Sequence, residues 1–413
     1  MAIIKNVQLI FSDLSKNSYK TWKGELHDDG TVISKFSAVG GTEQECNYGQ
    51  VGESFYDKKI KEKLRKGYSR AKTIETEPQT GAALSRQTLS EIAVNQIKHS
   101  NDAIKSLIRR LADSNVHKIT SGTNIVFDKD SGLFQTPLGV VSQEGITEAR
   151  DILTFFNDSP KFGAKYKKNI DSYLRLIPRR KGQTLRYESI FPTLDEVKKE
   201  SDVLDALENS LSLLNKPQKG SSAPTAVEQV FKLKFDVLNE PSERTRVSDW
   251  FYKSKKAMHH YDNVKIREIY LVDIEEYNQQ FNEKLGNIQE VWHGSSEANI
   301  LSILKSGIKV RPPSSAKIAG KLFGEGAYGS KTSSKSLGYT FSRWGQSSGD
   351  AGWVFCCDFA MGKAFEPTTY GISSVPTGYD SCFADPKKTG LNNDEYIVYS
   401  EKQVKIKYLL EVK

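Results

Sequence analysis

The alternation of hydrophobic and polar positions predicts a small β-rich domain at the start of the chain. Three segments alternate with the period of a half-buried strand, and Asp28–Gly30, between the second and the third, has the composition of a hairpin turn. The spacing becomes helical over Ser54–Lys66. Residues 1–77 are therefore expected to form a sheet with one helix. The predicted strands are Val7–Phe11, Tyr19–Leu26 and Thr31–Val39.

Helical spacing dominates the middle of the chain. Hydrophobic residues recur every three or four positions along Leu89–Leu111, and a capping box at Thr193–Glu196 opens a helix that continues to Leu214. Polar connectors at 75–85 and 215–225 flank this region, and the second is rich in Lys, Pro, Gly and Ser. Residues 84–214 are therefore expected to form an all-α domain.

Residues 225–413 return to strand-like alternation with few helical interruptions, which favours an antiparallel α+β domain. The last two predicted strands are joined by a short polar turn and are expected to form a terminal hairpin. The predicted fold class of the whole chain is thus α+β and multidomain. The predicted strands here are Phe231–Phe235, Ile266–Ile274, Trp353–Phe359, Tyr396–Tyr399 and Val404–Val412.

The composition of the chain limits the classes of partner and the cellular compartment that we expect. The formal net charge of +8 over 413 residues favours a polyanionic partner. Basic residues gather in Lys58–Lys72 and Lys161–Arg186; such runs are more often solvated, although the second could also meet DNA or the first domain. No apolar run approaches a membrane span, and Met1–Phe11 lacks the pattern of a secretory signal. Four cysteines match no zinc spacing, so a reducing intracellular compartment is expected.

The candidate chemistry lies in the last third of the chain, around Trp292–Ser295. Two later tyrosines would form flat walls for an aromatic ring, and a glycine backbone with a serine hydroxyl would bind an amide. The late carboxylate of Glu395 would stabilise a positive charge that develops on a sugar. These residue types suit cleavage of a nicotinamide–ribose bond. Gly324–Gly329 matches a dinucleotide-binding glycine pattern, but a polar loop precedes it where that fold requires a strand.

Four segments, in this order, resemble the catalytic domain of poly(ADP-ribose) polymerases. The resemblance implies an NAD+-dependent ADP-ribosyltransferase that releases nicotinamide, with NAD+ as co-substrate and no metal. His293, Tyr328 and Glu395 would be its catalytic triad. The segments are Val291–Ser295, Gly324–Tyr328, Ser334–Tyr339 and Asn393–Tyr399.

The same resemblance assigns further roles at the site. The nicotinamide ring would lie between Tyr328 and Tyr339, and its carboxamide would meet a glycine and a serine. Glu395 would bind the ribose 2′-hydroxyl, and Lys335 would lie beside it on the acceptor side. Glutamate at this position permits polymer growth, while single-unit transfer and a DNA-binding scaffold with a silent catalytic domain are the alternatives. The implied NAD+-binding set is His293, Gly294, Ser295, Tyr328, Ser336 and Tyr339.

The first two domains carry weaker resemblances to the same family. Thr21–Gly30 is similar to the first hairpin of a WGR domain, but Phe36–Ala38 stands where that domain has Trp-Gly-Arg. Trp22 and Phe36 are the candidate DNA contacts. Segments within 137–207, including Pro137–Gly139, resemble the helical regulatory domain that blocks the NAD+ site until it loosens. The implied partners are DNA breaks and acceptor proteins, including the chain itself, for a monomeric DNA-repair enzyme that is nuclear if eukaryotic.

Overall fold

The chain forms two compact units, which are described separately. The first unit comprises Met1–Arg86 and Ile119–Leu211, and the second comprises Gln87–Lys118 and Ser212–Lys413. The structure is a computed structural model. It describes residues 2–39, 41–74, 89–120, 126–128, 133–135, 140–156, 163–178, 186–211, 231–310, 322–341, 351–372 and 374–413. The predicted connectors at 75–85 and 215–225 and the segment Pro137–Gly139 lie outside these ranges.

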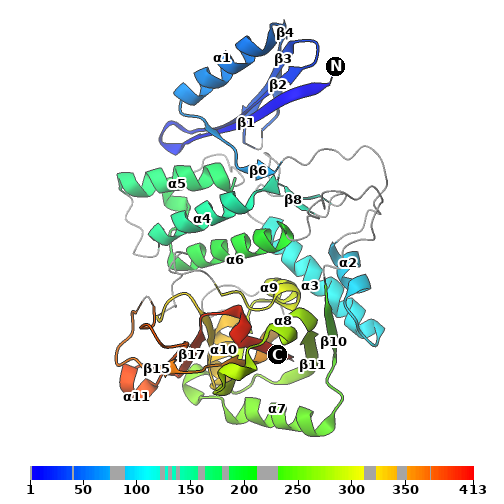
Figure 1. The fold of residues 1–413 in the computed structure, drawn as a ribbon, viewed down its shortest axis with the longest axis vertical. Helices are drawn as coiled ribbons and strands as arrows, with labels where there is room; N and C mark the ends of the chain where they lie inside the picture. The colour runs from blue at the N-terminus through cyan, green and yellow to red at the C-terminus, as the bar shows by residue number, and fades with distance from the viewer. Residues whose placement is uncertain are drawn as a thin grey trace. The chain divides into compact units, whose positions relative to one another are not determined.

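The first unit begins with an antiparallel five-stranded sheet in the order β4-β3-β2-β1-β5, with α1 (Gly52–Arg65) across one face (Figure 1). The three predicted strands and the predicted helix are confirmed. The β4 strand was missed because its residues are almost all polar and exposed, so no alternation marks it. The strands are β1 (Ile3–Asp13), β2 (Ser18–His27), β3 (Thr31–Ala38), β4 (Gln44–Gln50) and β5 (Ser69–Arg70).

The core of this sheet lies under α1. Tyr56 and Ile60 of the helix are buried against apolar side chains of the strands. The predicted turn between β2 and β3 is present, because Gly30 has a φ of 83° and the Asp29 carboxylate accepts the Thr31 N–H at 3.0 Å. The sheet side chains of this core are Val7, Leu9, Trp22, Leu26 and Val32.

Three helices complete the first unit, namely α4 (Gln143–Phe155), α5 (Ala164–Leu176) and α6 (Leu194–Leu211). One of the two hydrogen bonds of the predicted capping box is seen, because the Thr193 hydroxyl accepts the Glu196 N–H at 3.3 Å. The prediction of a wholly helical region missed two strand pairs. These are β6 (Thr73–Ile74) with β9 (Val140–Val141), and β7 (Val126–Asp128) with β8 (Leu133–Gln135).

The sheet and α5 are joined through the Asp171 carboxylate. It accepts hydrogen bonds from the Ser12 hydroxyl at 2.7 Å, the Leu14 N–H at 3.2 Å and the Tyr187 hydroxyl at 2.6 Å. Arg175, one turn further along α5, donates to the Ser12 carbonyl at 3.1 Å. The second basic stretch therefore contributes a contact to the first domain through Arg175.

The second unit begins with two helices, α2 (Leu89–Gln96) and α3 (Asp102–Thr120). The helical spacing of hydrophobic residues over Leu89–Leu111 continued across the break between these two helices, so the sequence did not predict the break. The chain leaves the helix there because Lys98 exchanges backbone hydrogen bonds with Leu233 at 3.0 Å and Phe235 at 2.9 Å. Asn101 then caps α3 by accepting the Ile104 N–H at 3.1 Å. The helices expected in residues 84–214 are thus divided between the two compact units.

Two sheets form the body of the second unit. A five-stranded sheet has the order β10-β11-β18-β14-β12, and a four-stranded sheet has the order β13-β17-β16-β15. All of their pairings are antiparallel except β15 with β16, which confirms the predicted antiparallel α+β domain. The strands are β10 (Leu233–Val237), β11 (Ile266–Ile274), β12 (Ile288–Ser295), β13 (Ala327–Gly329), β14 (Gly352–Ala360), β15 (Ala364–Phe365), β16 (Ser381–Ala384), β17 (Glu395–Val398) and β18 (Val404–Val412).

The predicted terminal hairpin is wrong. β17 pairs with β13 and β16, whereas β18 pairs with β11 and β14. The connection crosses from one sheet to the other through a short 3-10 turn, Glu401–Gln403. The Gln403 side chain holds this crossing by donating to the Ala360 carbonyl at 2.9 Å and the Asp380 carbonyl at 3.0 Å. The sequence pattern therefore identified both strands but not their partners.

Helices cover these sheets and complete the core. Val247 and Phe251 of α7 (Pro241–Lys253) are fully buried in a cluster with Trp292 of β12. Cys356, Cys357 and Cys382 are buried free thiols. Within the described ranges, no helix is both long and apolar enough to cross a membrane. The remaining helices are α8 (Glu275–Gln280), α9 (Glu297–Ser306), α10 (Ser333–Thr340) and α11 (Pro386–Thr389).

Candidate active site

The candidate site is built on β12, which lies at one edge of the five-stranded sheet and carries His293 and Gly294. The tryptophan that precedes them is an anchor. The Trp292 ring is fully buried, stacks on Trp250 of α7 at 4.0 Å and donates from Nε1 to the Ser254 hydroxyl at 3.2 Å. Trp292 therefore fixes the strand from behind and does not face a ligand.

One backbone pair connects the two sheets beside the site. Trp292 and Ser330 exchange N–H to carbonyl hydrogen bonds of 2.8 and 3.1 Å. Ser330 directly follows β13, whose partner strand β17 begins with Glu395. This pair therefore brings the histidine strand, the tyrosine strand and the glutamate strand to one place.

His293 and Tyr328 are in direct contact. His293 Nδ1 lies 2.8 Å from the Tyr328 carbonyl, which only accepts, so the neutral ring carries its proton on Nδ1. The Tyr328 hydroxyl donates to the Gly324 carbonyl at 2.7 Å and accepts the Phe323 N–H at 3.0 Å. Burial raises the pKa of Tyr328, so the hydroxyl stays protonated. Both rings are thus held in one orientation.

Gly294 and Ser336 form the second contact. A Cβ added to Gly294 would lie 1.9 Å from the Ser336 carbonyl oxygen, so only glycine allows this approach of strand and helix. Ser336 is 3% exposed, and among the described residues none bonds to its hydroxyl. The backbone of Gly294 and the hydroxyl of Ser336 therefore lie side by side, and together they can donate to and accept from a carboxamide.

Lys335 and Glu395 form the third contact. The Glu395 carboxylate, on a residue that is 8% exposed, lies 2.6 Å from Lys335 Nζ, which also donates to the Asp394 carbonyl at 3.3 Å. Burial raises the pKa of Glu395, and the Lys335 charge opposes this rise. The arrangement supplies a carboxylate in a poorly hydrated place with one cation to keep it ionised.

Two further predicted residues flank these pairs. Tyr339 lies on α10, one turn after Ser336, and is 56% exposed. Ser295 is buried and directly precedes Ser296, the N-cap of α9. The structure therefore brings together three pairs of predicted residues, while ring stacking by Tyr339 and ligand binding by Ser295 stay predictions.

Sequence reasoning missed two residues that build the site. Trp250 stacks behind the motif, and Asp394 bonds the turn after β13. Trp250 lies in a helix for which no pattern was noted. Asp394 stood inside a quoted motif, but its neighbours Asn393 and Glu395 are also polar, so no sequence signal set it apart.

The two candidate DNA contacts, Trp22 and Phe36, differ in how far their rings are exposed. Trp22 is 3% exposed and its ring covers Gly24, where an added Cβ would lie 2.6 Å from the indole. This tryptophan belongs to the core of the first sheet, which corrects the expectation that its ring meets a ligand in this conformation. Phe36 on β3 is 36% exposed, so a stacking role there stays a prediction.

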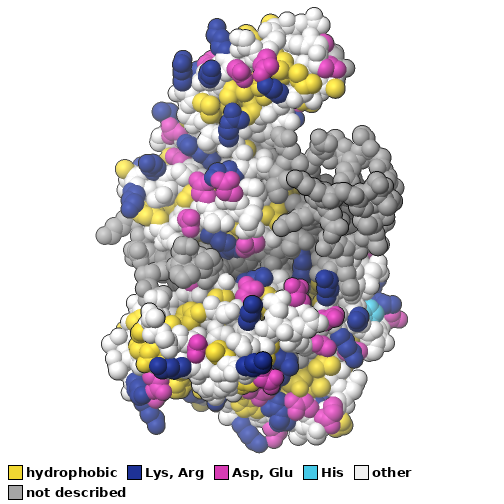
Figure 2. Space-filling model, viewed as in Figure 1, with side chains coloured by type: hydrophobic (Ala, Val, Ile, Leu, Met, Phe, Trp, Pro, Cys, Tyr) yellow, Lys and Arg dark blue, Asp and Glu magenta, His cyan; other side chains and the backbone are white. Residues whose placement is uncertain are grey.

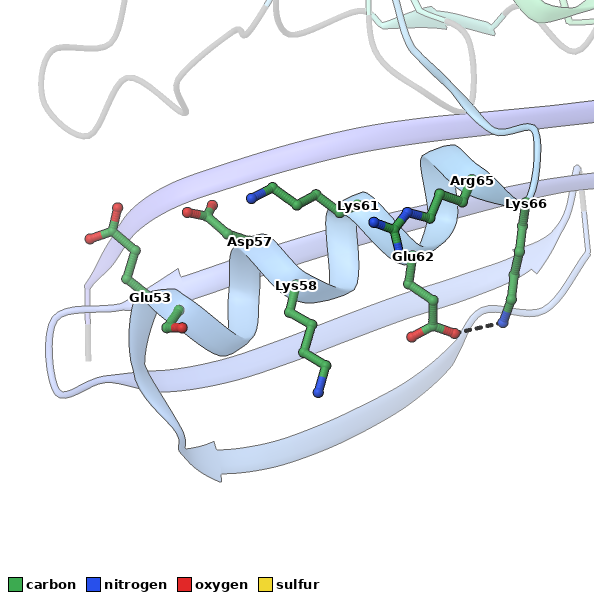
Figure 3. A pocket seen from close by; sticks show the side chains of 8 residues that line it. Glu53, Asp57, Lys58, Lys61, Glu62, Arg65 and Lys66 are labelled. Carbon is green, nitrogen blue, oxygen red and sulfur yellow. Dashed lines mark hydrogen bonds and ion pairs between the residues drawn. The ribbon is translucent and has the colours of Figure 1, made fainter.

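The first basic stretch is only partly available to an anion. A hollow on the outer face of α1 is lined by acidic and basic side chains (Figure 3). Lys66 pairs with Glu62 at 2.6 Å, while Lys58, Lys61 and Arg65 form no ion pair within the described part of the chain. On the face shown in Figure 2, acidic and basic side chains are interleaved across the surface. Among the described residues, no group of three or more His, Cys, Asp or Glu is arranged to hold a metal.

Known proteins resemble this chain both in its catalytic part and over most of its length. Residues 242–388 match the family model of the poly(ADP-ribose) polymerase catalytic domain. Poly [ADP-ribose] polymerase 1 of Gallus gallus is 26% identical over 75% of this chain and 33% of its own length. Poly [ADP-ribose] polymerase 2 of Homo sapiens is 29% identical over 42% of this chain and 35% of its own length.

A third relative is aligned over most of both proteins. Protein mono-ADP-ribosyltransferase PARP3 of Homo sapiens is 22% identical over 86% of this chain and 76% of its own length. This chain spans about a third of the length of the first relatives that it matches. The catalytic-domain match and the relatives together support membership of the poly(ADP-ribose) polymerase family.

Proposed function

We propose that this chain transfers ADP-ribose from NAD+ to protein side chains and releases nicotinamide. The observation that carries the proposal is the buried contact between Glu395 and Lys335, beside the two pairs that orient His293 and Gly294. A buried carboxylate held by a single lysine is costly for folding alone, and such groups mark functional sites. The match to the poly(ADP-ribose) polymerase catalytic domain supports NAD+ as the co-substrate.

The binding step follows from the two oriented pairs. His293 would bind a ribose hydroxyl on the adenosine side, with Ser295 nearby in sequence. The Gly294 backbone and the Ser336 hydroxyl would bind the carboxamide, and Tyr328 and Tyr339 would stack on the nicotinamide ring. Each of these residues belongs to a strand or a helix. Their backbones are therefore already fixed, and little conformational freedom of the protein is lost when the ligand binds.

The chemical step would use Glu395. Its carboxylate accepts a hydrogen bond from the 2′-hydroxyl of the nicotinamide ribose and stabilises the positive charge that develops on that sugar. The C1′–N bond breaks, its electron pair leaves with nicotinamide, and an acceptor oxygen forms the new bond to C1′. A hydroxyl acceptor releases its proton to Glu395 or to water, whereas an ionised carboxylate acceptor has no proton to lose. Lys335 keeps Glu395 ionised before the reaction. The acceptor is an acidic or serine side chain, or a hydroxyl of ADP-ribose already attached.

The first test is nicotinamide release from labelled NAD+ by wild type and Glu395→Gln. Because the carboxylate acts on developing charge, Glu395→Gln should lower kcat by about 100-fold or more with little change in KM. Glu366→Gln is the matched control, since Glu366 forms an exposed ion pair with Lys388 in the same unit. Turnover by Glu395→Gln equal to that of Glu366→Gln would refute this assignment of the carboxylate.

We further propose that the product is a polymer and that DNA breaks stimulate its synthesis in the nucleus. Glutamate at position 395 and the names of the first relatives, poly [ADP-ribose] polymerase 1, support this extension. The proposed arrangement is a WGR-like domain at 1–77, a helical regulatory domain at 84–214 and a catalytic domain at 225–413, acting as a monomer on acceptor proteins that include the chain itself.

Single-unit transfer is the second candidate, because the human relative that aligns over most of this chain is named a mono-ADP-ribosyltransferase. Automodification with labelled NAD+, with and without 5′-phosphorylated nicked DNA, separates the possibilities on a gel. A DNA-dependent ladder supports the polymerase, and a single labelled band supports mono-transfer. Complete absence of labelling together with retained DNA binding would support a scaffold with a silent catalytic domain.

A further inference from the structure

We propose that Asp394 is the positioning residue that holds Glu395 and Lys335 in their reactive arrangement. The proposal rests on the proposed function, because it concerns the same carboxylate. Asp394 immediately precedes Glu395, but its side chain bonds to a different segment, the turn between β13 and α10. None of the roles assigned above uses this side chain.

The Asp394 carboxylate is fully engaged with that turn. Oδ1 accepts from the Ser330 hydroxyl at 3.0 Å and the Thr332 hydroxyl at 3.1 Å, and Oδ2 accepts the Lys331 N–H at 2.8 Å. The Thr332 N–H donates in turn to the Ser330 hydroxyl at 3.1 Å. Bonds of this kind to an ionised acceptor are about twice as strong as neutral ones. One carboxylate thus fixes three consecutive residues.

The backbone of the same residues extends these contacts to the site. The Asp394 carbonyl accepts from Lys335 Nζ at 3.3 Å, and Ser330 is paired through its backbone with Trp292. A displacement of Asp394 would therefore be felt by the glutamate that follows it, by the lysine on α10 and by the strand that carries His293. Asp394 is the point at which these three segments meet.

The hydrogen bonds of Asp394 replace the ordinary side-chain cap at the start of α10. Thr332 occupies the N-cap position but makes no capping bond with its side chain, because its hydroxyl is directed to Asp394. The orientation of α10 thus depends on a residue of the glutamate segment. Since Lys335 lies in the first turn of α10, Asp394 sets the position of the acceptor-side lysine, whereas Ser336 is held separately by its close approach to Gly294.

Asp394 also acts on Glu395 through its charge. A negative charge beside Glu395 raises the pKa of that carboxyl, in addition to burial and against the Lys335 charge. Among the described residues, the other titratable groups near Glu395 are Tyr328, Tyr339 and Cys382, and each stays neutral because its pKa is raised. Replacing the charge with a neutral amide should therefore lower the pKa of Glu395, so the acidic limb of kcat should move to lower pH.

The test compares Asp394→Ala, Asp394→Asn and the control Asp380→Ala with wild type. Asp380 also accepts a backbone N–H, from Lys363 at 2.9 Å, but at an exposed loop of the same unit. Measurements on the full chain are kcat and KM for nicotinamide release, the pH dependence of kcat, the Kd of nicotinamide by calorimetry, and the rate at which an amine-reactive reagent modifies Lys335, quantified by mass spectrometry.

Asp394→Ala should lower kcat at least tenfold, leave the Kd of nicotinamide within about threefold and speed labelling of Lys335 severalfold. Asp394→Asn should recover part of kcat, because its oxygen still accepts from the Ser330 and Thr332 hydroxyls, and should show the shifted acidic limb. Asp380→Ala should match wild type. A kcat for Asp394→Ala within twofold of that of Asp380→Ala overturns the proposal. A lower kcat that is accompanied by weaker nicotinamide binding and a lower melting temperature also overturns it, because the variant would then be generally misfolded.

An inactive wild type would refute the proposed function without obscuring this result. The labelling of Lys335 depends on its contacts with Glu395 and Asp394 and not on turnover. Faster labelling in Asp394→Ala than in Asp380→Ala would then still support the positioning role, and an unchanged rate would overturn it.

Discussion

Gly294→Ala isolates the closest approach in the candidate site. The added methyl group would lie 1.9 Å from the Ser336 carbonyl oxygen, 2.8 Å from its carbonyl carbon and 3.2 Å from its Cα. All three atoms belong to the backbone of α10, so no side chain can rotate away. Relief requires β12 and α10 to separate by on the order of 1 Å, since nonbonded carbon and oxygen atoms rest at roughly 3.5 Å.

The expected size of the effect follows from that displacement. Overpacking of a well-packed core costs about 1–3 kcal/mol, and collision with backbone places this variant at the upper end. At about 2–4 °C per kcal/mol, the melting temperature of the second unit should fall by roughly 6–12 °C. Loss of two carboxamide hydrogen bonds at about 1 kcal/mol each should weaken nicotinamide binding roughly 30-fold.

Gly338→Ala is the matched control. It lies on α10, and a Cβ added there meets no atom within 4 Å. Alanine in a helix interior is more stable than glycine by about 0.5–1 kcal/mol, so this variant should melt at the wild-type temperature or slightly above it. Calorimetric melting and nicotinamide titration of both variants are the measurements. Equal melting temperatures, or a nicotinamide Kd for Gly294→Ala within twofold of wild type, would refute the close approach described above.

Three further variants test electrostatics and packing. Lys335→Met removes the cation that opposes burial of Glu395, so the pKa of that carboxyl should rise and the acidic limb of kcat should move to higher pH; an unmoved limb contradicts the pairing. The Arg246 hydrogen bond lowers the pKa of Glu243 from 4.5 to about 2, so its stabilisation is complete above pH 4.5 and lost as the pH falls towards 2. Melting temperatures between those pH values should therefore fall less steeply in Glu243→Gln than in wild type. Asn115→Ala removes a 2.8 Å hydrogen bond from α3 to the first turn of α9 and should cost about 1–2 kcal/mol in urea unfolding, against no more than about 0.5 kcal/mol for the exposed Ser106→Ala.

The sequence identified elements more reliably than partners. The predicted strand Ile266–Ile274 coincides with β11, because its alternation reports which face is buried. The terminal hairpin was wrong because the apolar residues of β17 and β18 record burial alone, and each strand is buried in a different sheet. Strand pairing depends on long-range contacts that a local pattern does not contain.

The site shows the same division. The residue types at His293, Tyr328 and Glu395 predicted the chemistry, but the distance between Gly294 and Ser336 could not be read from residues so far apart in the chain. Asp394 was missed because its partners belong to another segment. Spacing along a chain shows which side chains are available, and only the fold shows which of them meet.

The Asp171 junction has a mechanical consequence for the first unit. Pulling the β1–β2 hairpin from α5 would strip a partly buried carboxylate of its three donors, which costs more than the bonds themselves contribute. The sheet and α5 should therefore move as one rigid unit. A force applied to the sheet should rotate α5 before it unfolds that helix. Such a junction would pass a displacement of the sheet on to α5.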